Sequence, residues 1–161
     1  MNKSKKEDFN AIINGNIFED KAWIHYWKTR QKINNCGKWM IFFNANNYEF
    51  VKEICIKAIN EKIINSCKHT AFEIDSLIHE KSEKYNSGVI CFYLDGTLDT
   101  EHKKVLKFLK NNDLIRKTKT GKLYNISFKF DDQTRMGEYG NKFNPIIKLS
   151  DFINLETYEF I

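Results

Sequence analysis

The sequence contains little proline and little glycine, which argues against a chain divided by flexible linkers. Pro145 is the single proline among 161 residues, and glycine occurs only seven times. Linkers between domains are typically rich in proline, glycine or serine, and no such stretch is present. A chain of this length suffices for one hydrophobic core. We therefore predict one domain over residues 1–161, with residues 1–18 as a flexible N-terminal extension.

Long apolar runs and metal-binding patterns are also lacking. No stretch approaches the roughly 18 apolar residues of a transmembrane helix, and no apolar signal region follows the charged start MNKSKKEDF. The four cysteines are isolated, without a C-x-x-C pair or a Cys/His pair at zinc spacing. These absences predict a cytoplasmic protein with buried, reduced thiols, no membrane partner, no metal site and no cofactor.

The chain has a moderate excess of positive charge, with a formal net charge of +5. A solvated surface rich in lysine accounts for such an excess without any function. A basic face that attracts nucleotides or nucleic acid accounts for it as well. The net charge alone leaves both interpretations open.

Hydrophobic periodicity predicts helices and strands in alternation. Helical spacing of apolar residues indicates helices over 19–33, 46–64 and about 99–112, and a short one over 76–85. Their expected N-caps are Asp20, Asn46 or Asn47, and Asp99 or Thr100. Strands are expected over 38–43, 66–75 and 89–94, in a pair around Thr120-Gly121, and in the tail IIKLSDFI ahead of a short docking segment. This order predicts an α+β fold with an antiparallel or mixed sheet and helices on one face.

The stretch VICFYLDGT (89–97) resembles the nucleophile loop of haloacid-dehalogenase-type phosphatases over about seven residues. That family attacks phosphate with an aspartate two residues before the D-G-T aspartate, and here the position holds Tyr93. A phenol is a poor nucleophile at neutral pH, and no downstream G-D-x-x-x-D run supplies magnesium ligands. We therefore interpret Asp95-Gly96 as a structural turn between a strand and a helix.

A broader resemblance is spread over residues 23–141. Its pieces are GKWMIFF (37–43), CKHTAF (67–72), VICFY (89–93) and FKFDDQTRMGEYGN (128–141). An expected helix follows the first piece, and another follows the third. Together they resemble the uncharacterised Bles03-like family, whose last element has the pattern Y-K-P-D-x-x-T-x-x-G-x-Y. The chain departs from that pattern at Phe130 (proline in the family), Arg135 (an aromatic residue) and His69 (an aliphatic residue).

The resemblance implies a fold similar to the cap-binding translation initiation factor 4E, with a curved antiparallel sheet backed by two or three helices. Fold alone does not carry function. The residues that match or adjoin the family's motifs give the predicted ligand-binding set, with no catalytic residue among them: Trp39, Lys68, Lys129, Asp131, Thr134, Arg135 and Tyr139.

These residue types suit a phosphate-bearing ligand. Lys68 and Lys129 would place two ammonium groups on one face if their strands are neighbours, and Arg135 would add a bidentate fork. Trp23, Trp27 and Trp39 would offer stacking surfaces for a base. The alternative is structural: the tryptophans form core or interface, and Lys129 with Asp131 is a surface ion pair on the solvent face of a strand.

Two other functions remain open. A phosphothreonine-lyase-like enzyme needs a base such as Lys68 or Lys129 and an acid such as His69 or His102. Lys68 and His69, adjacent on a strand, point to opposite faces, and His102 in a first helical turn is expected at the surface. A protein-binding inhibitory module, of the kind that mobile elements encode, is the third function. Our leading prediction is a binding domain for a nucleotide or RNA, without catalysis.

Overall fold

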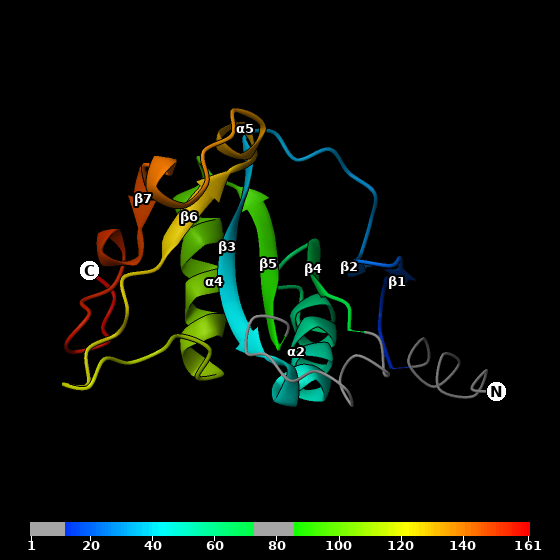
Figure 1. Ribbon diagram of the computed structural model, residues 1–161, viewed down its shortest axis with the longest axis horizontal. Helices are drawn as coiled ribbons and strands as arrows, with labels where there is room; N and C mark the ends of the chain where they lie inside the picture. The colour runs from blue at the N-terminus through cyan, green and yellow to red at the C-terminus, as the bar shows by residue number, and fades with distance from the viewer. Residues whose placement is uncertain (1–11, 73–85) are drawn as a thin grey trace. The chain divides into compact units, whose positions relative to one another are not determined.

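The computed structural model describes residues 12–72 and 86–161 (Figure 1). In chain order, their strands and helices are β1 (Asn16–Glu19), β2 (Trp23–Trp27), β3 (Cys36–Asn44), α2 (Tyr48–Asn60), β4 (Ser66–Thr70), β5 (Ser87–Asp95), α4 (Asp99–Asn111), β6 (Ser127–Phe130), α5 (Asp131–Arg135) and β7 (Ile147–Lys148). Short 3-10 turns, η1 (Ala45–Asn47), η3 (Gly140–Lys142) and η4 (Leu149–Asp151), complete the elements.

Among these residues, seven strands follow the hydrogen-bonded order β1-β2-β4-β5-β3-β6-β7. The pairs β1–β2, β2–β4, β3–β6 and β6–β7 are antiparallel. In Figure 1, β3 in cyan runs beside β5 in green. The α+β class with an antiparallel sheet is therefore confirmed, whereas the resemblance to factor 4E stays a prediction. The predicted helix over 76–85 lies outside the described residues.

The chain forms two units. One comprises the described residues of Met1–Gln31 and Phe42–Cys91, and the other comprises Lys32–Ile41 and Phe92–Ile161. In the described parts of the chain, no helix is both long and apolar enough to cross a membrane.

The first unit begins with a hairpin where the sequence predicted a helix. β1 pairs with β2 in the register Phe18↔His25, and the Asp20 side chain accepts hydrogen bonds from the amides of Ala22 and Trp23 at 2.8 and 2.7 Å. Asp20 therefore caps the turn of this hairpin and not a helix. β1 also takes in residues 16–18 of the expected N-terminal extension, of which residues 1–11 lie outside the described structure.

The inner face of β2 and β4 forms the core of this unit together with α2. Ile24, Tyr26, Cys67 and His69 alternate with outward residues along the two strands, and all four are buried. The predicted helix over 46–64 is confirmed as α2, which buries Val51, Ile54, Cys55, Ile56, Ala58 and Ile59. The expected burial of thiols is confirmed for Cys55, Cys67 and Cys91, whereas Cys36 is half-buried.

In the second unit, α4 packs against β3 and β6 through His102. This residue was expected at the surface, and that prediction is wrong, because His102 is fully buried beside Trp39 and Phe128. The indole Nε1 of Trp39 donates a hydrogen bond to His102 Nδ1 at 3.0 Å, and His102 Nε2 contacts the Gly96 carbonyl oxygen at 2.9 Å. Both ring nitrogens are thus engaged within the core.

The D-G-T stretch is a structural turn, as predicted. Asp95 accepts hydrogen bonds from the Thr97 amide and hydroxyl at 2.9 and 2.6 Å. A Cβ on Gly96 would overlap the ring of Phe130, so this position requires glycine. The predicted helix follows as α4, but its N-cap is Leu98, and neither Asp99 nor Thr100 caps it. Similarly, Asn47 precedes α2 without a capping hydrogen bond from its side chain.

The C-terminal region departs most from the predicted pattern. Around Thr120-Gly121 the chain turns back with one isolated bridge, Lys117↔Leu123, in place of a strand pair. After β6, the chain forms α5, which the sequence did not predict. The tail contributes the short strand β7, and Ile153 bridges Phe160 close to the C-terminus.

Candidate functional site

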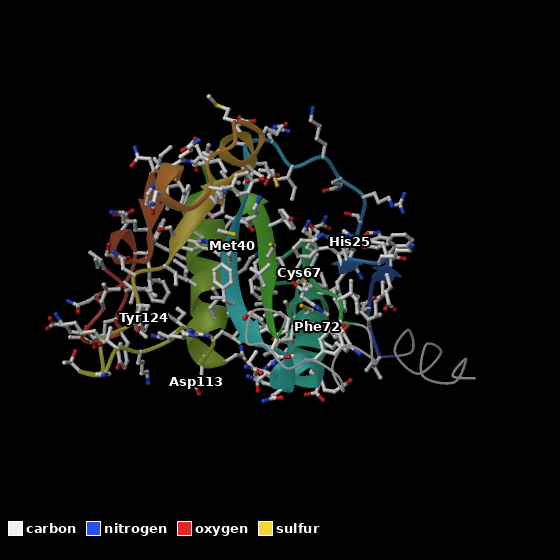
Figure 2. The ribbon with its side chains drawn as sticks, viewed as in Figure 1. His25, Met40, Cys67, Phe72, Asp113 and Tyr124 are labelled. Atoms are coloured by element: carbon white, nitrogen blue, oxygen red, sulfur yellow. The ribbon has the colours of Figure 1, made fainter. Side chains whose placement is uncertain are left out.

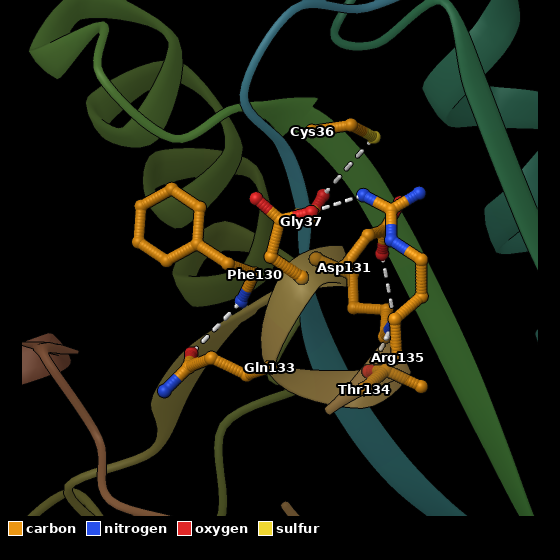
Figure 3. A network of polar contacts seen from close by, with 9 residues as sticks. Cys36, Gly37, Phe130, Asp131, Gln133, Thr134 and Arg135 are labelled. Atoms are coloured by element: carbon orange, nitrogen blue, oxygen red, sulfur yellow. Dashed lines mark hydrogen bonds and ion pairs between the residues drawn. The ribbon is translucent and has the colours of Figure 1, made fainter. Parts of the chain in front are cut away.

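The most informative site in the second unit lies where β6 turns into α5. The Gln133 side chain holds this turn, because its Oε1 accepts a hydrogen bond from the Phe130 amide at 3.1 Å (Figure 3). Its Nε2 donates to the carbonyl oxygen of Asn144 at 3.0 Å, which ties the later loop to α5. These two contacts fix the turn from β6 into α5, which carries Asp131 and Thr134.

Two lysines oppose each other on adjacent strands of this unit. Lys38 on β3 pairs with Lys129 on β6 in the antiparallel register, so both side chains lie on the same face of the sheet. Trp39 and Phe128 point to the opposite face, which packs on α4. Like charges placed directly opposite each other destabilise a sheet. Such a pair therefore needs a counter-charge or a ligand.

Lys38 has its counter-charge within the protein. Its Nζ lies 2.9 Å from Asp131 Oδ1 and donates to Thr134 Oγ1 at 3.2 Å. It also lies 5.8 Å from the centre of the Tyr93 ring. Lys38 is thus fully engaged, and Asp131 and Thr134 are positioned by it.

Lys129 has no such partner. Its side chain is only 5% exposed, and no hydrogen bond or ion pair joins it to any residue in 12–72 or 86–161. Its Nζ lies 4.1 Å from the ring centre of Tyr139 and 5.2 Å from that of Phe143, so its nearest favourable contacts are aromatic faces. Burial and the nearby Lys38 charge lower the pKa of Lys129, while Glu138 acts in the opposite direction.

Arg135 and Asp132 form an exposed ion pair at the end of α5. They border an open cavity of about 610 Å³, which is lined by Lys32, Ile33, Asn34, Asn35, Cys36, Asp131, Asp132 and Arg135. Burial and the adjacent Asp131 raise the pKa of Cys36 to about 12, so its thiol stays protonated and is a poor nucleophile. The cavity is polar and carries both signs of charge.

The predicted ligand-binding residues divide into three groups. Asp131 and Thr134 meet at Lys38, which pairs across the strands with Lys129, and Tyr139 lies over Lys129. Arg135 follows Thr134 on α5 (Figure 3 labels Asp131, Thr134 and Arg135). Trp39 is fully buried and offers no surface to a base. Lys68 lies on β4 in the other unit, and β5 and β3 separate β4 from β6 in the strand order. The condition that Lys68 and Lys129 occupy neighbouring strands is not met.

Sequence reasoning missed Lys38 and Phe143. Lys38 belongs to the GKW motif, but only the β3–β6 register reveals that it faces Lys129. Phe143 reaches Lys129 across a loop that no periodic pattern describes. The alternation Phe128, Lys129, Phe130 did indicate which face Lys129 takes, although it also predicted a solvent-exposed side chain, and the side chain is buried.

Neither buried histidine is placed for acid-base chemistry. The Thr70 carbonyl oxygen can only accept a hydrogen bond, so His69 Nδ1 donates to it at 2.8 Å. His69 Nε2 therefore accepts a hydrogen bond from the Tyr26 hydroxyl at 2.9 Å. By the same reasoning, His102 Nε2 donates to Gly96. Burial lowers the pKa of both rings, that of His69 to about 4. Two neutral histidines with occupied nitrogens do not supply the acid that a lyase requires.

Comparison with models of known protein families gives no match, and comparison with curated proteins gives none either. The resemblance to the Bles03-like family therefore stays a prediction. Within the described residues, no three His, Cys, Asp or Glu side chains are arranged to hold a metal ion.

Proposed function

We propose that the cluster of Lys38, Lys129, Asp131, Thr134 and Tyr139, the lysine-pair site, binds a phosphate-bearing ligand such as a nucleotide, without catalysing a reaction. The observation that carries the proposal is Lys129, a residue only 5% exposed whose ammonium lies against aromatic rings and has no ion-pair partner among the described residues. Partial desolvation of an unpaired charge costs stability, and a protein retains such a group most readily where a ligand neutralises it.

The surroundings of Lys129 favour a phosphate over other anions. A phosphate group offers several acceptor oxygens, and the Lys129 ammonium and the Thr134 hydroxyl can both donate to it. Lys38 keeps Asp131 in place, which leaves one ammonium for the ligand and sets the position of Thr134. The Tyr139 ring is 60% exposed beside Lys129 and can stack on a base.

The resemblance to the Bles03-like family and to the fold of factor 4E is part of this proposal. It supports a ligand site on the sheet face away from the main helix of the second unit, where Lys38 and Lys129 lie. A protein-binding role is a second candidate, favoured by the exposed side chains of Met136, Tyr139 and Ile146 in the segment after α5. The lyase has no support from the histidines.

Titration calorimetry with AMP, UMP, their triphosphates and inorganic phosphate tests the proposal. We expect at least one nucleotide to bind wild-type protein, with an affinity that falls as salt rises. Lys129→Gln should weaken this binding about 10- to 100-fold, because a hydrogen bond to a charged group is lost. Lys107→Gln removes the same charge from an exposed position of α4 and serves as the matched control.

Two outcomes would reject the proposal. One is the absence of heat with every nucleotide at millimolar concentration. The other is an equal loss of affinity in both variants, because the effect would then follow net charge and not the lysine-pair site. Retention of a protein partner in a pull-down that Met136→Ser abolishes would favour the second candidate.

A further inference from the structure

The outer face of the β1–β2–β4 sheet collects aromatic and basic side chains of the first unit. Along β2, the residues Trp23, His25 and Trp27 alternate with the buried Ile24 and Tyr26. Their strand partners on the same face are Asn16 and Phe18 on β1, and Ser66, Lys68 and Thr70 on β4. Figure 2 labels His25 among the side chains over this hairpin. We call these residues the outer aromatic face.

The side chains of this face are accessible to a ligand. Phe18 is 54% exposed, and Trp23, His25, Trp27 and Lys68 are each half-buried. Tryptophans on a sheet face that only closed the core would be buried, as Trp39 is in the second unit. Residues two apart on a strand are spaced by roughly 7 Å, so the rings form a row along β2.

Cations accompany the rings of this row. Lys68 Nζ lies 3.9 Å from the centre of the Trp23 ring, and the Arg30 guanidinium lies 5.2 Å from that of Trp27. Among the described residues, the carboxylate in contact with this face is that of Asp20. It lies 3.1 Å from His25 Nε2 and accepts two backbone amides. The face therefore combines π-surfaces with positive charge that is not neutralised.

We propose that the outer aromatic face binds single-stranded RNA. Bases stack on Trp23, Trp27 and Phe18, because stacking is tolerant of sequence and needs only an accessible ring face. Lys68 and Arg30, which cover the two indoles in the free protein, move onto the phosphates as bases take their place. Thr70 Oγ1 accepts from the Val89 amide and keeps its own proton, which can be donated to a ribose 2′-hydroxyl.

The site is independent of the lysine-pair site, so each can fail without the other. Lys129→Gln should weaken nucleotide binding and leave binding of RNA to the outer aromatic face unchanged. Trp27→Ala should weaken RNA binding and leave nucleotide binding unchanged. The two single variants therefore separate the two proposals in one set of measurements.

Fluorescence titration with an oligouridylate of about 8 nucleotides tests the inference. We expect binding to quench the fluorescence of Trp23 and Trp27, and affinity to fall about 10-fold or more in Trp27→Ala. Phe42→Ala is the matched control, because Phe42 is an aromatic residue of the same unit that is 62% exposed outside this face. Lys68→Gln should weaken binding and its salt dependence without changing the fold, compared with Lys107→Gln.

Two further ligands distinguish the kind of nucleic acid. An RNA duplex of the same length should bind more weakly than the single strand, because its bases are not free to stack. An oligodeoxythymidylate should bind more weakly than the oligouridylate. Equal binding of duplex and single strand, no quenching, or equal affinities for Trp27→Ala and Phe42→Ala would overturn the proposal. Equal binding of the DNA strand would overturn the assignment to RNA.

Discussion

Lys68 and Lys129 each place an ammonium group over an aromatic ring, but in two different settings. Lys68 Nζ lies 3.9 Å from the Trp23 ring centre on an open sheet face, and Lys129 Nζ lies 4.1 Å from that of Tyr139. The first side chain is half-buried and the second is 5% exposed. At the open site water solvates the charge freely, whereas at the closed site the surrounding side chains exclude part of that water without neutralising the charge. The contact alone therefore does not define the function of a lysine.

The tryptophans also differ between a buried and an open setting. This difference predicts the largest change in the free energy of unfolding. Trp39→Ala should lower the free energy of unfolding by about 3–5 kcal/mol, because it opens a cavity and leaves His102 Nδ1 without its donor. Trp27→Ala on the outer aromatic face should cost about 1 kcal/mol or less. Urea denaturation of both variants checks this. Equal losses would mean that Trp27 is a core residue and would remove the basis of the RNA-binding face.

The buried His69 of the first unit extends the contrast to pH. Burial lowers the pKa of His69 to about 4, below the value near 6.5 of an unfolded chain. Below pH 6.5 the unfolded state binds a proton that the folded state refuses, so stability should fall by about 3 kcal/mol as the pH drops from 6.5 to 4. Urea denaturation at several pH values measures this loss. His69→Gln should reduce the slope. Equal slopes in wild type and His69→Gln would contradict a neutral buried ring.

The smallest expected change in stability tests the setting of Lys129 most specifically. Lys129→Met replaces an unpaired, partly desolvated charge with an apolar side chain of similar length, so it should raise the free energy of unfolding by about 1 kcal/mol. Lys68→Met removes a solvated charge and should change it by less than about 0.5 kcal/mol. Thermal and urea denaturation of the two variants at pH 7 provide the comparison. A destabilised Lys129→Met would show that the ammonium already has a good partner within the protein.

Sequence reasoning succeeded where one periodicity dominates. The helices α2 and α4 have apolar stripes at helical spacing, and β5 is a nearly continuous apolar run, so all three were predicted close to their observed bounds. The interpretation of Asp95-Gly96 as a structural turn was also confirmed by the hydrogen bonds from Thr97 to Asp95. That interpretation rested on the absence of the aspartate that the phosphatase reaction needs.

The sequence failed where two periodicities overlap. Trp23, Tyr26, Trp27 and Arg30 share a helical face, but Trp23, His25 and Trp27 also alternate with Ile24 and Tyr26 as in a strand. Pairing with β1 and β4 selects the strand, and pairing between distant segments has no local signal. Lys38 was missed for the same reason, because its position opposite Lys129 depends on the pairing of β3 with the distant strand β6.

The most direct test of the account measures stability and nucleotide affinity on the same preparations of wild type and Lys129→Met, with Lys107→Met as the control. If the unpaired ammonium of Lys129 is kept for a phosphate-bearing ligand, Lys129→Met should be more stable than wild type and bind the nucleotide at least about 10-fold more weakly. The Lys107→Met control should change neither property. A variant that binds the nucleotide as tightly as wild type, or that loses stability, would contradict the claim that Lys129 is held in place for a ligand.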